Sequence, residues 1–159
     1  MTQNSTVENR IKELGYTLPQ VAAPVASYVP AVVSGSYVYT SGQLPFIDGA
    51  LPETGKVHTE PGGVNPDDAK KYAAMCALNA LAAVKSAIGD LDRVTKIVKV
   101  VGFVSSHPEF TAQPAVINGA SELLGDIFGE AGQHARSAVG VPVLPLDSPV
   151  EVEIIVEYV

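Results

Sequence analysis

Arg136 is the residue whose type and position most clearly indicate chemistry. It is one of only three arginines and stands in the segment Ala-Arg-Ser-Ala-Val-Gly-Val, at the start of an expected apolar strand. A guanidinium in that setting must find a partner or a ligand, because an unpaired charge in apolar surroundings is costly. Its planar fork suits two-point binding of a substrate carboxylate. The alternative is a structural ion pair with a nearby glutamate, which composition alone favours.

Three glutamates share one face of the C-terminal strand, in which acidic and apolar residues alternate: Glu151, Glu153 and Glu157. Neighbours on one strand face point the same way, so they do not form the two acids facing each other across a cleft that a glycosidase-type mechanism needs. For Glu153 and Glu157 we prefer the solvated face of an edge strand. One of the three can still act alone as a base.

The histidines and the single cysteine give weaker evidence of a functional site. His58, His107 and His134 stand far apart along the chain, and none has a second ligand three or four residues away, so no metal site is expected. Cys76 lies mid-helix among small apolar residues, which indicates a buried hydrophobe. A single cysteine also excludes an intrachain disulfide.

Two other kinds of enzyme site are excluded. The glycines of residues 125–132 follow an expected helix, whereas a phosphate-binding loop joins a strand to a helix. No Gly-x-Ser-x-Gly segment is present, and Ser106 and His107 are only sequence neighbours, so a serine hydrolase is not expected.

Composition limits the partners. The 159 residues correspond to one domain, and 17 acidic against 10 basic side chains give a net charge of −7, which argues against nucleic-acid or anionic-membrane binding. Apolar residues make up 47% and charged residues only 17%, which hints at an oligomer that covers apolar surface. The N-terminus lacks the apolar core of a signal peptide, and no run of about 18 apolar residues occurs, so a cytoplasmic location is expected.

Local patterns predict a two-layer α+β domain. Residues 94–105 are apolar on both faces: Ile97, Val101 and Phe103 are expected on one face, and Val94, Val98, Val100 and Val104 on the other. Helices must therefore cover one face and something else the other. The expected elements are a helix over 5–14, a hairpin over 31–34 and 36–41, a long excursion over 42–68, a helix over 65–88, a strand over 94–105, a helix over 114–128, and strands over 136–144 and 150–158.

Several blocks of the chain, spaced in order over residues 24–159, resemble the RidA/YjgF family. These reactive intermediate deaminases are also labelled endoribonuclease L-PSP. Residues 1–23 then form an N-terminal helix and an extended lead-in. The matching blocks are Tyr28-Val29 through Gly35, Tyr39-Thr40-Ser41-Gly42-Gln43-Leu44-Pro45, Asn118, Ala135-Arg136-Ser137, and Leu144-Pro145 through Val150-Glu151-Val152-Glu153.

The resemblance implies a chorismate-mutase-like α+β fold with the order β-β-α-β-α-β-β. It also implies a homotrimer with a β-barrel-like core and three clefts between subunits. Active members of the family hydrolyse enamines and imines, released from serine or threonine by pyridoxal-phosphate enzymes, to 2-keto acids and ammonia. They need no cofactor and no metal.

The resemblance also implies roles for individual residues. Arg136 matches the arginine that holds the substrate carboxylate, Glu151 the acid that positions the hydrolytic water, and Tyr28 the cleft tyrosine lent across the interface. The substrate-binding positions that line the same cleft correspond to Ser41, Gly42 and Asn118.

The chain departs from the family pattern in ways that indicate a divergent branch. Ala138 stands where many relatives have a cysteine, which excludes thiol chemistry at that point, and His134 stands where a proline is common. Residues 46–68 and the N-terminal helix are longer than in compact members. His134 is either a second polar group in the cleft or a plain strand residue.

Two alternatives to an imine deaminase stay open. The first is a non-catalytic or regulatory trimer that binds small carboxylates without turnover. The second, a ribonuclease, follows only from the family label, and the net charge of −7 speaks against it.

Overall fold

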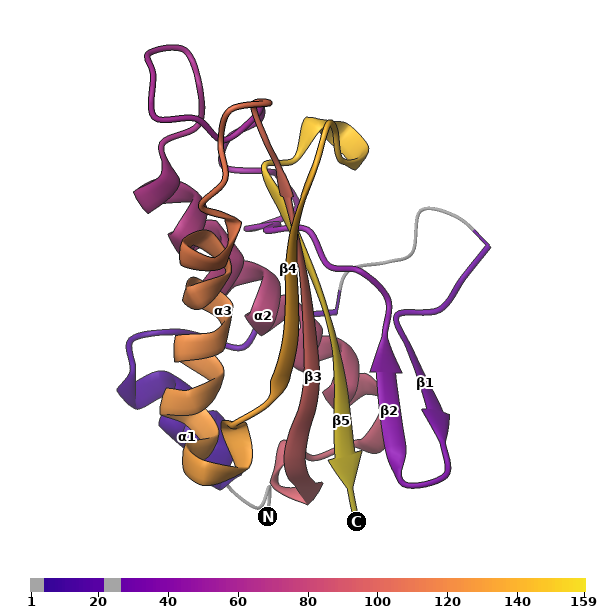
Figure 1. The fold of residues 1–159 in the computed structure, drawn as a ribbon. Helices are drawn as coiled ribbons and strands as arrows, with labels where there is room; N and C mark the ends of the chain where they lie inside the picture. Colours follow the sequence, from indigo (N-terminus) through magenta and orange to yellow (C-terminus); the bar gives the residue numbers. More distant parts are fainter. Residues whose placement is uncertain (1–4, 22–26) are drawn as a thin grey trace.

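Five strands form one mixed sheet, and the two long helices cover one of its faces (Figure 1). The structure is a computed structural model that describes residues 5–21 and 27–159. The expected two-layer α+β plan and its element order are confirmed. The helices are α1 (Thr6–Glu13), α2 (Pro66–Ile88), α3 (Gln113–Phe128), η1 (Leu91–Arg93), η2 (Gly129–Gly132) and η3 (Pro145–Asp147); the strands are β1 (Ala31–Ser34), β2 (Tyr37–Thr40), β3 (Val94–Ser105), β4 (Ala135–Val141) and β5 (Val150–Tyr158).

Helix α2 begins and ends at the expected signals. The Asn65 side chain accepts a hydrogen bond from the Asp67 backbone N–H at 2.8 Å, and the helix stops at Gly89, whose φ of 87° suits glycine. Its alanine-rich buried face lets α3 approach closely. A Cβ on Gly119 of α3 would lie only 1.9 Å from the Lys70 carbonyl oxygen. The helix layer is therefore held at short range by small residues.

The strand order is β1-β2-β5-β3-β4, which places β5 at the centre of the sheet. β5 pairs antiparallel with both β2 and β3, whereas β3 and β4 run parallel. The interpretation of β5 as an edge strand is therefore wrong. Alternation along a strand reports which face is buried, but it carries no information about which strands lie on either side.

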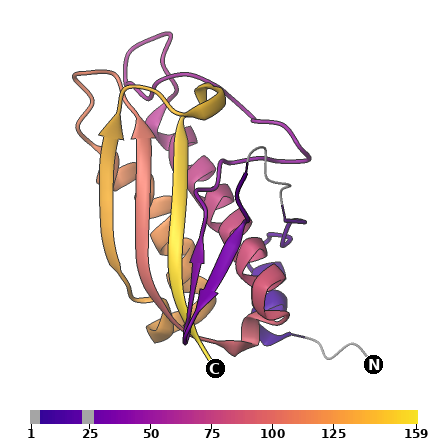
Figure 2. The same cartoon turned by 90° about the vertical axis from the view of Figure 1, so that its right-hand side faces the viewer.

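The two faces of the sheet differ sharply. The side chains of β5 that point to the helices are fully or almost fully buried: Val150, Val152, Ile154 and Val156. The three glutamates alternate with them and share the opposite face, as expected. We call that face the open face, because no helix within residues 5–21 and 27–159 covers it (Figures 1 and 2).

Strand β3 departs from a simple alternation. Its pairing with β5 shifts register between Ile97 and Lys99, so Ile97 is buried on the same face as Val100 and Val104. Alternation alone places Ile97 with Val101 and Phe103, and this prediction is wrong because a bulge inserts an extra residue. Val101 and Phe103 are half-buried on the open face.

The long excursion after β2 is anchored at Val57, which is completely buried. The Val57 N–H donates to the Ser105 carbonyl at 2.7 Å, and the His107 N–H donates to the Val57 carbonyl at 3.1 Å. These bonds bring His58 beside His107, with 3.9 Å between the two ring centroids. These two histidines are far apart along the chain but are neighbours in the fold, since separation along the chain does not limit contact.

The N-terminal helix is tied to the rest of the domain. The Asp92 carboxylate accepts hydrogen bonds from the Thr6 and Val7 N–H groups, both at 2.8 Å, and from the Ser5 hydroxyl at 2.9 Å. Burial acts to raise the pKa of Asp92, but these donors together lower it below its ordinary value. Ile11 is completely buried in the core. The boundary expected between residues 23 and 24 lies outside the described residues.

None of the helices within residues 5–21 and 27–159 has the length and apolar character needed to traverse a bilayer.

Candidate functional site

Arg136 is half-buried on the edge strand β4 and reaches toward α3. Its Nη1 donates to the Asn118 Oδ1 at 2.8 Å and to the Ser121 Oγ at 3.2 Å, and its Nη2 donates to the Pro114 carbonyl at 3.4 Å. We call these four residues the arginine cluster. All of its acceptors are neutral, so the guanidinium is oriented but its charge is not cancelled.

The structural ion pair that composition favours for Arg136 is not observed. Within residues 5–21 and 27–159, the ion pairs are Arg10–Glu13, Lys70–Glu122 and Lys85–Glu8. Arg136 has no carboxylate partner in that part of the chain. A guanidinium that has no acidic partner can bind the carboxylate of a ligand.

His134 contacts Ser121, a member of the arginine cluster. Its Nδ1 lies 2.6 Å from the Gly132 carbonyl, and its Nε2 lies 2.8 Å from the Ser121 Oγ. A carbonyl can only accept, so Nδ1 donates, and in the neutral imidazole Nε2 accepts from the Ser121 hydroxyl. Ser121 in turn accepts from Arg136. His134 therefore orients Ser121, and its role is positional.

Glu151 lies on the open face at the start of β5, with Gly42 directly beside it. A Cβ on Gly42 would lie 2.8 Å from both Cδ and Oε1 of Glu151, so only glycine leaves the carboxylate its present place. The Gln43–Val152 bridge, closed by hydrogen bonds of 2.8 and 3.0 Å, sets this approach. Burial raises the pKa of the Glu151 carboxyl, and the like charge of Glu153 raises it further.

Ser41, the residue before Gly42, is hydrogen-bonded to the segment that precedes β1. Its Oγ donates to the Val29 carbonyl at 2.6 Å, and its N–H donates to the Pro30 carbonyl at 2.8 Å. Tyr28 immediately precedes this anchored segment and is 47% exposed. We call Glu151 and Gly42 the glutamate group.

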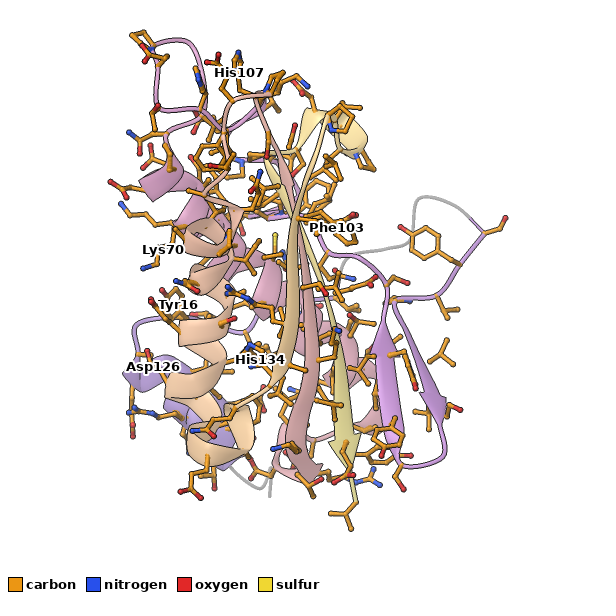
Figure 3. All side chains as sticks on the ribbon, viewed as in Figure 1. Tyr16, Lys70, Phe103, His107, Asp126 and His134 are labelled. Atoms are coloured by element: carbon orange, nitrogen blue, oxygen red, sulfur yellow. The ribbon has the colours of Figure 1, made fainter. Side chains whose placement is uncertain are left out.

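The arginine cluster and the glutamate group lie on opposite faces of the sheet. Arg136 is in register with Val100, which is buried beneath the helices. Glu151 is in register with Phe103, and Figure 3 shows Phe103 on the side away from the helices. β3 separates β4 from β5, which adds roughly 10 Å of sheet. A single chain therefore does not bring Arg136 and Glu151 onto one small ligand.

Cys76 takes no part in either group. It is completely buried in α2, as expected, and burial raises the pKa of its thiol well above the ordinary value, with a further contribution from the Glu151 charge. A thiol held in that form is a poor nucleophile.

Comparison with known proteins assigns this chain to a family. A family model described as "YjgF/chorismate mutase-like, putative endoribonuclease" matches residues 8–158. The chain belongs to the YjgF family. The resemblance drawn from the sequence is thereby confirmed, together with the chorismate-mutase-like fold.

Individual relatives agree with this assignment to the YjgF family. Protein TCP17 of Trypanosoma cruzi is 43% identical over 152 residues, which cover 95% of this chain and 93% of that protein. The crystal structure of the protein Atu1372 with unknown function, from Agrobacterium tumefaciens, has a TM-score of 0.88 and 45% identity, covering 97% of this chain and 93% of that one. E. coli TdcF with bound serine has a TM-score of 0.65 and 26% identity, covering 88% and 94%.

Within this YjgF-family fold, Ser121 and the Pro114 carbonyl are contacts of Arg136 that the sequence analysis did not identify. Pro114, Asn118 and Ser121 are spaced four and three residues apart, so they form one stripe of α3. This spacing is the feature of the sequence from which the contacts of Arg136 could have been predicted. The prediction would also have required knowing that β4 lies beside α3, which local patterns do not report.

Proposed function

We propose that the protein hydrolyses small enamines and imines derived from amino acids to 2-keto acids and ammonia, in clefts between the subunits of a homotrimer. The observation that carries the proposal is the arginine cluster, in which Arg136 is oriented by neutral acceptors and has no carboxylate partner among the described residues. A guanidinium held in this way favours a ligand with a free carboxylate.

The separation of the two groups supports an inter-subunit cleft. Arg136 lies on an edge strand, and Glu151 lies on the open face. That face also carries apolar side chains that water would otherwise contact: Val32, Tyr39 and Val139 are 52%, 45% and 44% exposed. If the β4 edge of one subunit meets the open face of the next, a ligand between them contacts both groups.

The chemistry then follows from the residues in that cleft. Arg136 binds the substrate carboxylate, and Glu151 accepts a proton from a water that attacks the imine carbon. Glu151 passes that proton to the imine nitrogen, which gives a neutral carbinolamine. Glu151 then takes the proton of the carbinolamine hydroxyl and delivers it to the amino nitrogen, so the C–N bond breaks as the C=O bond forms and ammonia leaves. Burial raises the pKa of Glu151, which makes its carboxylate a stronger base toward the attacking water. The imine is already electrophilic, so neither step needs a metal or an activated nucleophile.

The test is a turnover assay with 2-aminoacrylate, generated in the cuvette from serine by a pyridoxal-phosphate-dependent dehydratase. The wild type should accelerate the release of ammonia and pyruvate beyond hydrolysis in water. Arg136→Ala and Arg136→Lys should remove the acceleration, since lysine cannot bind a carboxylate through two parallel hydrogen bonds. Arg10→Ala, on the exposed surface of α1, is the matched control. No acceleration by wild type with several such imines would reject the proposal.

A second candidate is a trimer that binds small amino-acid carboxylates without turnover, and the serine bound in E. coli TdcF favours it. Here Arg136 still matters, but Glu151→Gln leaves function intact. Calorimetric titration with 2-ketobutyrate, run beside the turnover assay, separates the two candidates. Binding that is lost in Arg136→Ala, without any turnover by the wild type, would support the second one.

A further inference from the structure

We propose that His58, His107 and Glu109 form a binding site for a divalent transition-metal ion such as Zn²⁺, at the end of the sheet where β3 meets the long excursion. One ligand atom from each residue lies within 4.8 Å of the other two. The site is separate from the arginine cluster and from Glu151 and its neighbours, and it does not depend on the proposed function.

The backbone places the two histidines side by side. Val57 and Ser106 form a parallel bridge, so the next residue on each segment, His58 and His107, are neighbours across it. Three hydrogen bonds hold this arrangement: Val57 N–H to the Ser105 carbonyl at 2.7 Å, His107 N–H to the Val57 carbonyl at 3.1 Å, and His58 N–H to the Val64 carbonyl at 3.0 Å. The two rings stack 3.9 Å apart at 24°.

A tight turn over residues 107–110 brings the Glu109 carboxylate close to the two histidines. The Phe110 N–H donates to the His107 carbonyl at 2.9 Å, with Pro108 at the second position of the turn. Phe110 is 6% exposed and so anchors the end of the turn. The turn folds Glu109 back toward His107, and the Glu109 N–H reaches the His107 Nδ1 at 3.3 Å.

The packing around His58 leaves its side chain little freedom. A Cβ on Gly63 would lie 2.7 Å from the His58 Cβ, so glycine is required where the excursion folds back over it. Both histidines are half-buried and Glu109 is exposed. Two ligands are therefore held in place by the backbone, while the third can swing in from solvent.

The donor set indicates the kind of ion. Two imidazoles and one carboxylate suit a borderline ion such as Zn²⁺, whereas Mg²⁺ and Ca²⁺ prefer oxygen ligands only. Zn–N bonds of about 2.0–2.1 Å place two nitrogens of a tetrahedral site about 3.4 Å apart. The two stacked rings must turn on binding, because an imidazole nitrogen coordinates an ion in the plane of its ring. Three protein ligands leave a fourth position for water.

The Lys56 ammonium is already engaged, because it donates to the Pro142 carbonyl. A cavity of about 270 Å³, lined by His107, Pro108, Gln113 and Pro142 among others, borders the cluster and offers a path of entry.

The test is calorimetric titration of ZnCl₂ into untagged protein that has been stripped with a chelator, with MgCl₂ as the ion control. We expect one Zn²⁺ per chain, and an affinity at least about tenfold weaker in His58→Ala/His107→Ala. His134→Ala is the matched control, because His134 is the third histidine and lies beside α3, away from His107 (Figure 3). It should keep wild-type affinity. Zn²⁺ should also raise the thermal unfolding midpoint of the wild type but not of the double variant.

A second measurement does not depend on the variants folding. One equivalent of Zn²⁺ should shift the imidazole NMR signals of two histidines in the wild type and leave those of the third in place. Absence of a stoichiometric Zn²⁺ complex, equal affinity in the double variant, or a perturbed third histidine would each overturn the proposal.

Discussion

At the scale of single residues, two charged side chains of the candidate site are positioned by the residues that touch them. Arg136 is oriented by Asn118 and Ser121 and retains an uncancelled charge, and Glu151 fits only because residue 42 lacks a side chain. Both features place a charged group in a defined position without neutralising it. Two predictions follow from the surroundings of Glu151.

Gly42→Ala should reduce turnover far more than stability. The added methyl group would overlap Cδ and Oε1 of Glu151, which are at the mobile end of that side chain, so the carboxylate moves while the backbone stays. A displacement of about 1 Å in a catalytic group lowers activity by roughly 100-fold. Steady-state kinetics of imine hydrolysis and urea unfolding of the same variant are the measurements. Unchanged kcat/KM would show that this carboxylate does not act in the reaction.

Glu151→Gln should change how stability depends on pH. Burial and Glu153 raise the pKa of Glu151 in the folded chain, so the folded state holds this proton more tightly than the unfolded state does. Between the ordinary and the raised pKa, the wild type therefore loses stability as pH rises. The glutamine variant lacks that loss, so its stability relative to wild type should grow from about pH 4 toward neutrality.

Urea unfolding over that pH range measures the difference. Glu157→Gln, further along the same strand face, is the matched substitution. A constant difference between Glu151→Gln and wild type across the range would contradict a raised pKa for Glu151.

At the scale of elements, small residues decide how closely α3 packs. Gly119 and Gly125 are both in α3, but their surroundings are opposite. Gly119 touches the backbone of α2, whereas a Cβ on Gly125 would meet nothing within 4 Å. The same substitution should therefore have opposite effects at the two positions.

Gly125→Ala should stabilise the protein by about 0.5–1 kcal/mol, because alanine loses less conformational entropy in a helix than glycine does. Gly119→Ala should destabilise it by about 1–3 kcal/mol or more, because its Cβ would overlap the Lys70 carbonyl and force α2 and α3 apart. Chemical denaturation midpoints compare the two variants. A stabilised Gly119→Ala would contradict the close approach of the helices.

At the scale of the whole molecule, the question is how the two functional groups meet. Arg136 and Glu151 lie on opposite faces of one sheet, so the proposed cleft needs one residue from each of two subunits. In a cyclic trimer every interface joins two different surfaces of the chain, and each of the three clefts would take one copy of each group.

Mixing two inactive variants should therefore restore activity. When Arg136→Ala and Glu151→Gln chains are unfolded together in equal amounts and refolded, about one interface in four pairs an intact arginine with an intact glutamate. The mixture should recover roughly a quarter of wild-type turnover, while each variant alone stays inactive. Light scattering should give about three times 16.5 kDa for both. No recovery in mixed trimers would show that one chain supplies both groups.

Features that depend on near neighbours along the chain could be predicted from the amino-acid sequence. The cap at Asn65, the stop at Gly89 and the alternation of the last strand are local signals, and the structure follows each of them. The order of the elements and the family could also be predicted, because blocks such as Ala135-Arg136-Ser137 resemble those of the family in type and order, and the family model matches residues 8–158. Capping and periodicity act over a few residues, so they can be read along the chain.

Features that depend on segments far apart along the chain became known from the three-dimensional fold. It placed β5 at the centre of the sheet, moved Ile97 to the buried face through a bulge, and brought His58 against His107. It also put Arg136 and Glu151 on opposite faces. Strand pairing is chosen by burial of a whole face and by loop closure, and these act between residues that are far apart in sequence. No local pattern records that choice.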